Sequence, residues 1–146
     1  MNKNIEKTKI KIKIIDNFFT EQDFKEILSI QLKQIGNKEV KVYHNSIDKF
    51  YKTNTECMSQ NFLKKLHKNY HKKAINLLNE LNPDKVYLYD YSEFHIIETG
   101  ANCKFPIHDD TPNKLLSGVV YVKPETNVGT IFYTSKNGKG KKKALW

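Results

Sequence analysis

The stretch that decides the fold is VYLYDYSEFHIIETG, residues 86–100, which is rich in aromatic and β-branched residues. Such residues favour β-strands, and Gly100 breaks the run. The same signals recur later in the chain, before Pro124 and after Gly129. The strands expected from this half of the sequence are 86–91, 94–98, 115–122 and 130–133.

Working outward toward the N-terminus, helical patterns replace strand patterns. Thr20, with Asp23 three residues later, resembles a capping box, and apolar residues continue at helical spacing through Ile35, before Gly36. A second and stronger apolar stripe runs over residues 62–81 and is broken by Asn82 and Pro83. We therefore expect two helices that pack beside a sheet.

The remainder of the N-terminal half carries weaker signals. Residues 9–15 alternate lysine with isoleucine, which predicts a half-buried strand with lysines on its wet face. A short strand is expected at 40–43, followed by an irregular polar stretch at 45–56. The predicted class is thus α+β, with helices beside an antiparallel sheet of several short strands.

Length, charge and cysteine content narrow the function classes. The chain has 146 residues, enough for one domain, and its 25 basic residues are all lysine against 16 acidic ones. The net charge of +9 attracts phosphate, but without arginine there is no bidentate guanine reader, so nucleic-acid binding is the less favoured interpretation. No apolar run approaches the ~20 residues of a membrane span, and residues 1–13 have no leader features. Cys57 and Cys103 show no CxxC spacing, so we expect free thiols and a cytoplasmic location.

The segment that carries chemistry is FPIHDDTP, residues 105–112. On a strand, His108 and Asp110 point to the same face and can converge on one ion. They would supply two of the three ligands in the arrangement of two histidines and a carboxylate that binds Fe(II). Alternatively, His108 caps a turn, with Asp109 and Asp110 making local contacts to the backbone before Pro112.

Four other histidines carry weaker signals. His67 and His71 have a metal-compatible i, i+4 spacing, but they lie among lysines that disfavour a cation. His44 and His95 have nothing adjacent in the sequence that argues for a site, and His95 is interpreted as a core residue.

Two motifs resemble a known family. IIDNFFTEQD at residues 14–23 resembles the N-terminus of prolyl-hydroxylase-like 2-oxoglutarate/Fe(II) dioxygenases, and residues 94–133 are similar to the family's core. The second region combines the HxD motif with LLSGVVYVKP at 115–124 and the Gly129-Thr130 pair. The resemblance implies a double-stranded β-helix (jelly-roll or cupin-like) barrel with two flanking N-terminal helices.

The resemblance also implies a set of site residues. His108 and Asp110 would be iron ligands, Asp109 a spacer that points away, and Tyr121 the residue whose hydroxyl meets the far carboxylate of 2-oxoglutarate. The family also needs a second histidine and then a basic residue, but none of the residues after Asp110 is a histidine or an arginine. We therefore expect a single dioxygenase-like domain, 1–146, with a C-terminally incomplete barrel. Residues 9–84 would be its N-terminal strand and helical support, and 85–146 the first part of the core.

The activity that the resemblance implies is hydroxylation of a prolyl or other amino-acid side chain. Fe(II) would be the cofactor, 2-oxoglutarate and O2 the co-substrates, and a protein or amino acid the substrate partner. Two alternatives stay open: a nucleic-acid-directed oxygenase on the same scaffold, and a non-catalytic binding module derived from it.

Overall fold

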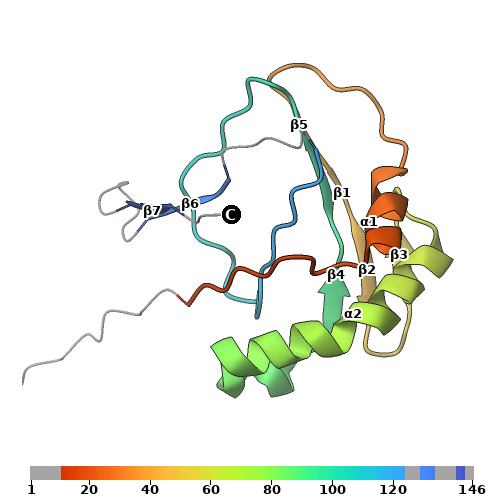
Figure 1. Cartoon of the computed structure of the whole chain (residues 1–146), viewed down its shortest axis with the longest axis vertical. Helices are drawn as coiled ribbons and strands as arrows, with labels where there is room; N and C mark the ends of the chain where they lie inside the picture. Colours follow the sequence, from red (N-terminus) through yellow and green to blue (C-terminus); the bar gives the residue numbers. More distant parts are fainter. Residues whose placement is uncertain (1–10, 124–128, 134–140, 144–146) are drawn as a thin grey trace, which may run out of the picture.

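The computed structural model describes residues 11–123 and 129–133, and the backbone of 141–143 (Figure 1). Its helical elements are α1 (Glu21–Leu28), α2 (Gln60–Leu81) and the 3-10 helix η1 (Pro83–Leu88). Its strands are β1 (Val40–Tyr43), β2 (Asn45–Asp48), β3 (Thr53–Thr55), β4 (Tyr91–Glu93), β5 (Ile96–Thr99), β6 (Ile131–Tyr133) and β7 (Lys141–Lys143). The fold is α+β, as expected.

The strands form three small antiparallel sheets, with the orders β1-β5, β3-β2-β4 and β6-β7. No closed barrel is present among the described residues. The β1–β5 and β2–β4 ladders share one register, since Tyr43 pairs with Ile96 and Ser46 pairs with Glu93. Between them the Phe94 N–H donates to the Asn45 carbonyl at 2.7 Å. The two ladders are thus one antiparallel pair with an interruption at its centre.

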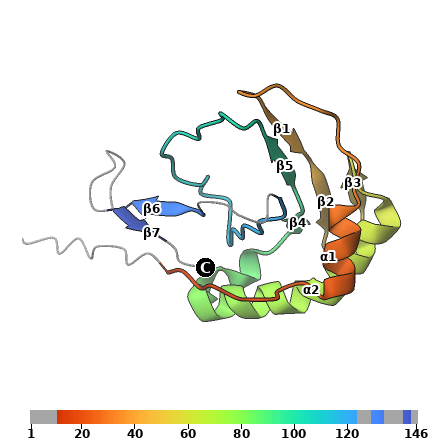
Figure 2. The ribbon, with the colours of Figure 1, turned by 45° about the horizontal axis from the view of Figure 1, so that its top comes forward.

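One face of this pair packs on α2, which lies across the end of β2 (Figures 1 and 2). Ile47 of β2 and Leu63 and Leu66 of α2 are fully buried and form the centre of the core. The predicted apolar stripe of the long helix is confirmed, and the Ser59 hydroxyl caps its start by accepting from the Phe62 N–H. None of the described helices combines the length and hydrophobicity needed to cross a bilayer.

The first helix is shorter than expected. Its predicted start is confirmed, because the Thr20 hydroxyl accepts from the Asp23 N–H at 3.2 Å. Its predicted continuation through Ile35 is wrong, since the helix ends at Leu28. The Ser29 hydroxyl donates to the Glu26 carbonyl at 2.7 Å, and such local bonds compete with further helix.

Predictions for three segments before residue 100 are wrong in the described residues. Residues 11–15 form no strand, because no segment pairs with them; Lys9 and Ile10 lie outside the described residues. Residues 45–56 contain β2 and β3 rather than an irregular stretch. Residues 86–88 belong to η1, which Pro83 begins, so only Tyr91 of the expected strand 86–91 is in β4.

The remaining predictions agree more closely with the structure. β1 covers the expected 40–43, β5 and β6 cover most of 94–98 and 130–133, and Cys57 and Cys103 are free thiols.

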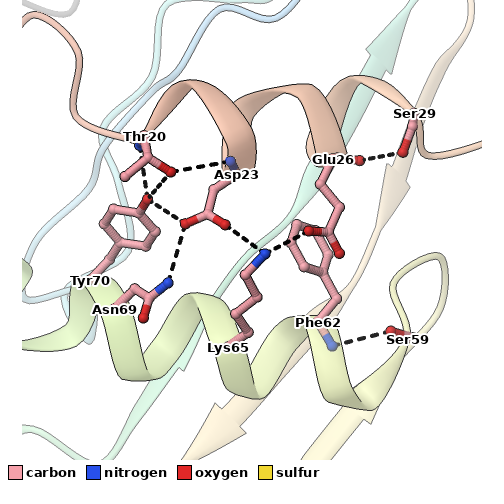
Figure 3. A network of polar contacts seen from close by, with 9 residues as sticks. All are labelled: Thr20, Asp23, Glu26, Ser29, Ser59, Phe62, Lys65, Asn69 and Tyr70. Atoms are coloured by element: carbon pink, nitrogen blue, oxygen red, sulfur yellow. Dashed lines mark hydrogen bonds and ion pairs between the residues drawn. The ribbon is translucent and has the colours of Figure 1, made fainter.

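A buried carboxylate joins the two helices (Figure 3). Asp23 is only 3% exposed; it accepts from the Tyr70 hydroxyl at 2.6 Å and forms an ion pair with Lys65 at 2.8 Å. Asn69 donates to the same carboxylate at 3.2 Å. The Lys65 and Tyr70 hydrogen bonds hold the pKa of Asp23 at about 2, below its ordinary value.

A buried amide joins the strands to the start of α2. Asn45 is fully buried, and its side-chain NH2 donates to the carbonyls of Phe94 at 3.1 Å and Tyr43 at 3.3 Å. Its side-chain oxygen accepts from the N–H groups of three consecutive residues, 56–58, at 3.1 to 3.3 Å. One side chain therefore satisfies backbone groups from three separate segments.

We expect Asn45→Ala to lower the free energy of unfolding by about 3 kcal/mol or more, because several buried backbone groups lose their partner at ~1–3 kcal/mol each. Urea unfolding followed by circular dichroism measures the change. The matched control is Asn54→Ala on the exposed side of β3, expected to cost less than about 0.5 kcal/mol. Equal losses for the two variants would contradict the role assigned to Asn45.

We expect Asp23→Asn to cost about 2 kcal/mol at pH 7 and much less at pH 2. Because the folded-state pKa of Asp23 lies below its unfolded value, its ionised form stabilises the fold above pH ~4. That contribution is lost as the pH falls from ~4 to ~2. Urea titrations of both proteins at pH 7, 4, 3 and 2 test this, with the exposed Glu21→Gln as control. A pH-independent difference would refute the ionised pairing.

Candidate metal centre

The segment that carries the HxD motif, 101–123, contains no helix or strand. The prediction of a strand at 115–122 is therefore wrong, and so is the placement of the motif at the end of a strand. The physical reason is that a strand needs a neighbour, and no described segment pairs with these residues. After β5 the segment makes a wide loop on the side of the sheet away from α1 (Figures 1 and 2).

His108 is exposed, and a hydrogen bond to its own segment orients its ring. Its Nδ1 lies 2.8 Å from the Pro106 carbonyl oxygen. A carbonyl accepts only, so Nδ1 carries the proton and donates. The neutral ring then keeps its lone pair on Nε2, which is the arrangement that metal-ligating histidines adopt.

Asp110 is ionised and held by two residues that follow it. The Ser117 hydroxyl donates to Oδ2 at 2.5 Å, and the Lys114 ammonium contacts Oδ1 at 2.9 Å. These two hydrogen bonds, together with the charge of Lys114, hold the pKa of Asp110 below its ordinary value.

Tyr121 belongs to a different contact. Its hydroxyl hydrogen-bonds the Thr130 hydroxyl, just after Gly129, whose φ of 72° is in the left-handed region. This contact joins the end of the irregular segment to the start of β6. Tyr121 is half-buried, whereas His108 and Asp110 are exposed.

The ligand set is incomplete in the described part of the chain. No group of three or more His, Cys, Asp or Glu side chains there is placed to hold a metal. His108 and Asp110 match Fe(II) in donor type and protonation, but they provide two of the three protein ligands that such a centre needs. Lys114 also competes with a cation for the Asp110 carboxylate.

The helical histidines form a stacked pair rather than a chelate. The His67 and His71 rings lie 4.5 Å apart at 19°, and His67 Nε2 is 3.1 Å from the Tyr89 hydroxyl. Burial lowers the pKa of both histidines, so the neutral rings are favoured. These contacts place both rings in the packing between α2 and the residue that follows η1.

Sequence reasoning missed one pair of histidines. It treated His44 and His95 as unrelated and His95 as a core residue, but the two rings lie 4.6 Å apart. Only the shared register of the two ladders brings them together. That register depends on β2, which the polar sequence at 45–48 did not indicate.

The chain matches no protein-family model, no curated protein and no solved structure. Interpretation of the site therefore depends on its own contacts and on the sequence motifs.

We expect Ser117→Ala to raise the pKa of Asp110 toward its ordinary value, because the Ser117 hydroxyl is the main group that stabilises the charged form. Carboxyl 13C NMR titration measures this pKa directly. Ser29→Ala, which removes a hydroxyl far along the chain, should leave it unchanged. An Asp110 titration curve that does not move in Ser117→Ala would contradict the short contact.

Proposed function

We propose that this chain forms part of a 2-oxoglutarate- and Fe(II)-dependent oxygenase that hydroxylates a prolyl or other amino-acid side chain. In this proposal His108 and Asp110 bind the iron, and the Tyr121 hydroxyl binds the far carboxylate of 2-oxoglutarate. The observation that carries it is the hydrogen bond between His108 Nδ1 and the Pro106 carbonyl, which leaves Nε2 available beside an ionised carboxylate.

The tautomer of His108 and the charge of Asp110 both suit metal binding. A metal ligand needs a neutral imidazole and a charged carboxylate. The Pro106 carbonyl selects the required tautomer of His108, and Ser117 and Lys114 keep Asp110 charged. When iron binds, Ser117 can stay as the donor that orients the carboxylate, while Lys114 has to move from Oδ1.

Exposed apolar side chains support the more specific proposal that residues 85–146 form the first part of a jelly roll. Several large apolar residues of the irregular segment are 37% to 66% exposed: Phe105, Ile107, Leu116, Val119 and Val120. Exposed apolar surface of this kind is often covered by another segment or by a partner. In a jelly roll, further strands would pair with 115–122 and cover these residues.

The chemistry sets a clear requirement for groups beyond those described here. Bound iron would let 2-oxoglutarate and O2 react with the substrate: one oxygen atom would enter the substrate C–H bond, the other would enter succinate, and CO2 would leave. This chain contributes two ligands and the orienting contacts of Pro106 and Ser117. The proposal therefore requires a third ligand from outside residues 111–146, which contain no histidine, and a basic group for 2-oxoglutarate, for which these residues offer lysines but no arginine.

The test is Fe(II)-dependent formation of succinate from 2-oxoglutarate by the natural full-length polypeptide that contains residues 1–146. His108→Gln and Asp110→Asn should reduce succinate to background. Tyr121→Phe should raise the KM for 2-oxoglutarate more than it lowers kcat. Asp109→Asn is the matched control, because it removes the neighbouring carboxylate and should retain activity.

Two outcomes would overturn the proposal. Full activity in His108→Gln or Asp110→Asn would place the iron elsewhere. No iron-dependent succinate from the folded wild-type protein would leave a non-catalytic binding module on this scaffold. Circular dichroism of each variant separates loss of ligands from loss of fold.

A further inference from the structure

The sheet face opposite α2 carries a second group of metal-binding side chains. Along β2, Asn45 and Ile47 are buried in the core, so the alternation of a strand places His44 and Ser46 on the other face. By the shared register, His44 lies opposite His95, and Ser46 opposite Glu93. The two imidazoles are therefore neighbours on this face, and Glu93 is the next side chain along it from His95.

The contacts within this group are close. The ring centroids of His44 and His95 are 4.6 Å apart at 78°, and His95 Nε2 lies 3.3 Å from Glu93 Oε1. A second carboxylate, Glu56, accepts from the His44 backbone N–H at 2.6 Å. In a chain of net charge +9, two carboxylates beside a histidine pair make this neighbourhood locally favourable to a cation.

One buried polar atom of this group, His95 Nδ1, has no hydrogen-bond partner among the described residues. The Glu93 carboxylate lies 3.3 Å from His95 Nε2, which favours the proton on that nitrogen and the lone pair of the neutral ring on Nδ1. That Nδ1 is buried, and no described residue hydrogen-bonds to it. Buried polar atoms without a partner are rare, and a bound ion or water is a common reason for them.

We propose that His44 and His95 chelate a divalent transition-metal ion of the Zn2+, Ni2+ or Cu2+ type. His95 binds through Nδ1 and His44 through a ring nitrogen, while water fills the other positions. Imidazole ligands select these ions, and the Glu93 carboxylate holds the His95 tautomer as an outer-shell acceptor. The proposal is independent of the proposed oxygenase site, which uses neither histidine.

The pair at His67 and His71 does not compete as a chelating site. Its rings stack nearly parallel, so their lone pairs do not point to a common ion. A metal at His44 and His95 would also link the two ladders where they are interrupted. Because the ion would bind only the paired strands, it should stabilise the folded chain.

The test is isothermal titration of Zn2+ and Ni2+ into the folded chain, with thermal unfolding followed in parallel. The wild-type chain should bind one ion and unfold at a higher temperature when it is loaded. His44→Gln and His95→Gln should each weaken binding at least about tenfold, and Glu93→Gln by about tenfold. His71→Gln is the matched control and should bind like wild type, and His108→Gln is measured to show whether the titrated ion lies at the proposed iron site instead.

Paramagnetic Cu2+ gives a readout that needs no variant. It should first broaden the NMR signals of His44, His95 and their strand neighbours. Broadening centred on His67 or His108, or wild-type affinity in both His44→Gln and His95→Gln, would overturn the proposal. Loss of binding in His108→Gln alone would assign the metal to the proposed iron site and leave no ion at this pair.

Discussion

The side-chain amide of Asn45 is the constraint on which the sheet depends. It lies at the interruption of the long antiparallel pair, where the break in the ladder would otherwise leave buried backbone groups without partners. By bonding to the backbone next to both ladders and to residues 56–58, it joins the interruption of the strands to the entry of α2. His44 and His95 lie opposite each other because the two ladders keep one register across this interruption.

The two candidate sites have different mechanical support. His44 and His95 are attached to paired strands whose other face is the core, so their separation is set by the scaffold. His108 and Asp110 are on an exposed irregular segment, where contacts with Pro106, Ser117 and Lys114 orient them. The separation of His44 and His95 is therefore maintained as long as the sheet is folded. The arrangement of His108 and Asp110 depends instead on the segment or partner that covers residues 101–123.

Local signals explain which elements could be predicted. The cap at Thr20 and the long apolar stripe of α2 are encoded within a few turns of chain, and both were predicted correctly. β2 was not, because its sequence, NSID, is poor in strand formers and is held by Asn45 and by its neighbours on both sides. Residues 115–122 show the opposite case. Their sequence has a strong strand propensity, but they form no strand because no described segment pairs with them. The pairing of His44 with His95 was missed for the same reason, because it exists only in the register.

Gly100 shows how the ordered sheet controls the irregular segment. A Cβ at this position would lie 2.3 Å from the Gly36 carbonyl oxygen, so only glycine permits the approach of the two backbones. That approach lets the Gly100 N–H reach the Glu39 carbonyl and the Asn102 N–H reach the Asn37 carbonyl, both at 2.8 Å. The path of the chain out of β5 is thereby fixed. The HxD segment starts from an anchored point, and its distance from the sheet is set by the few residues between Asn102 and His108.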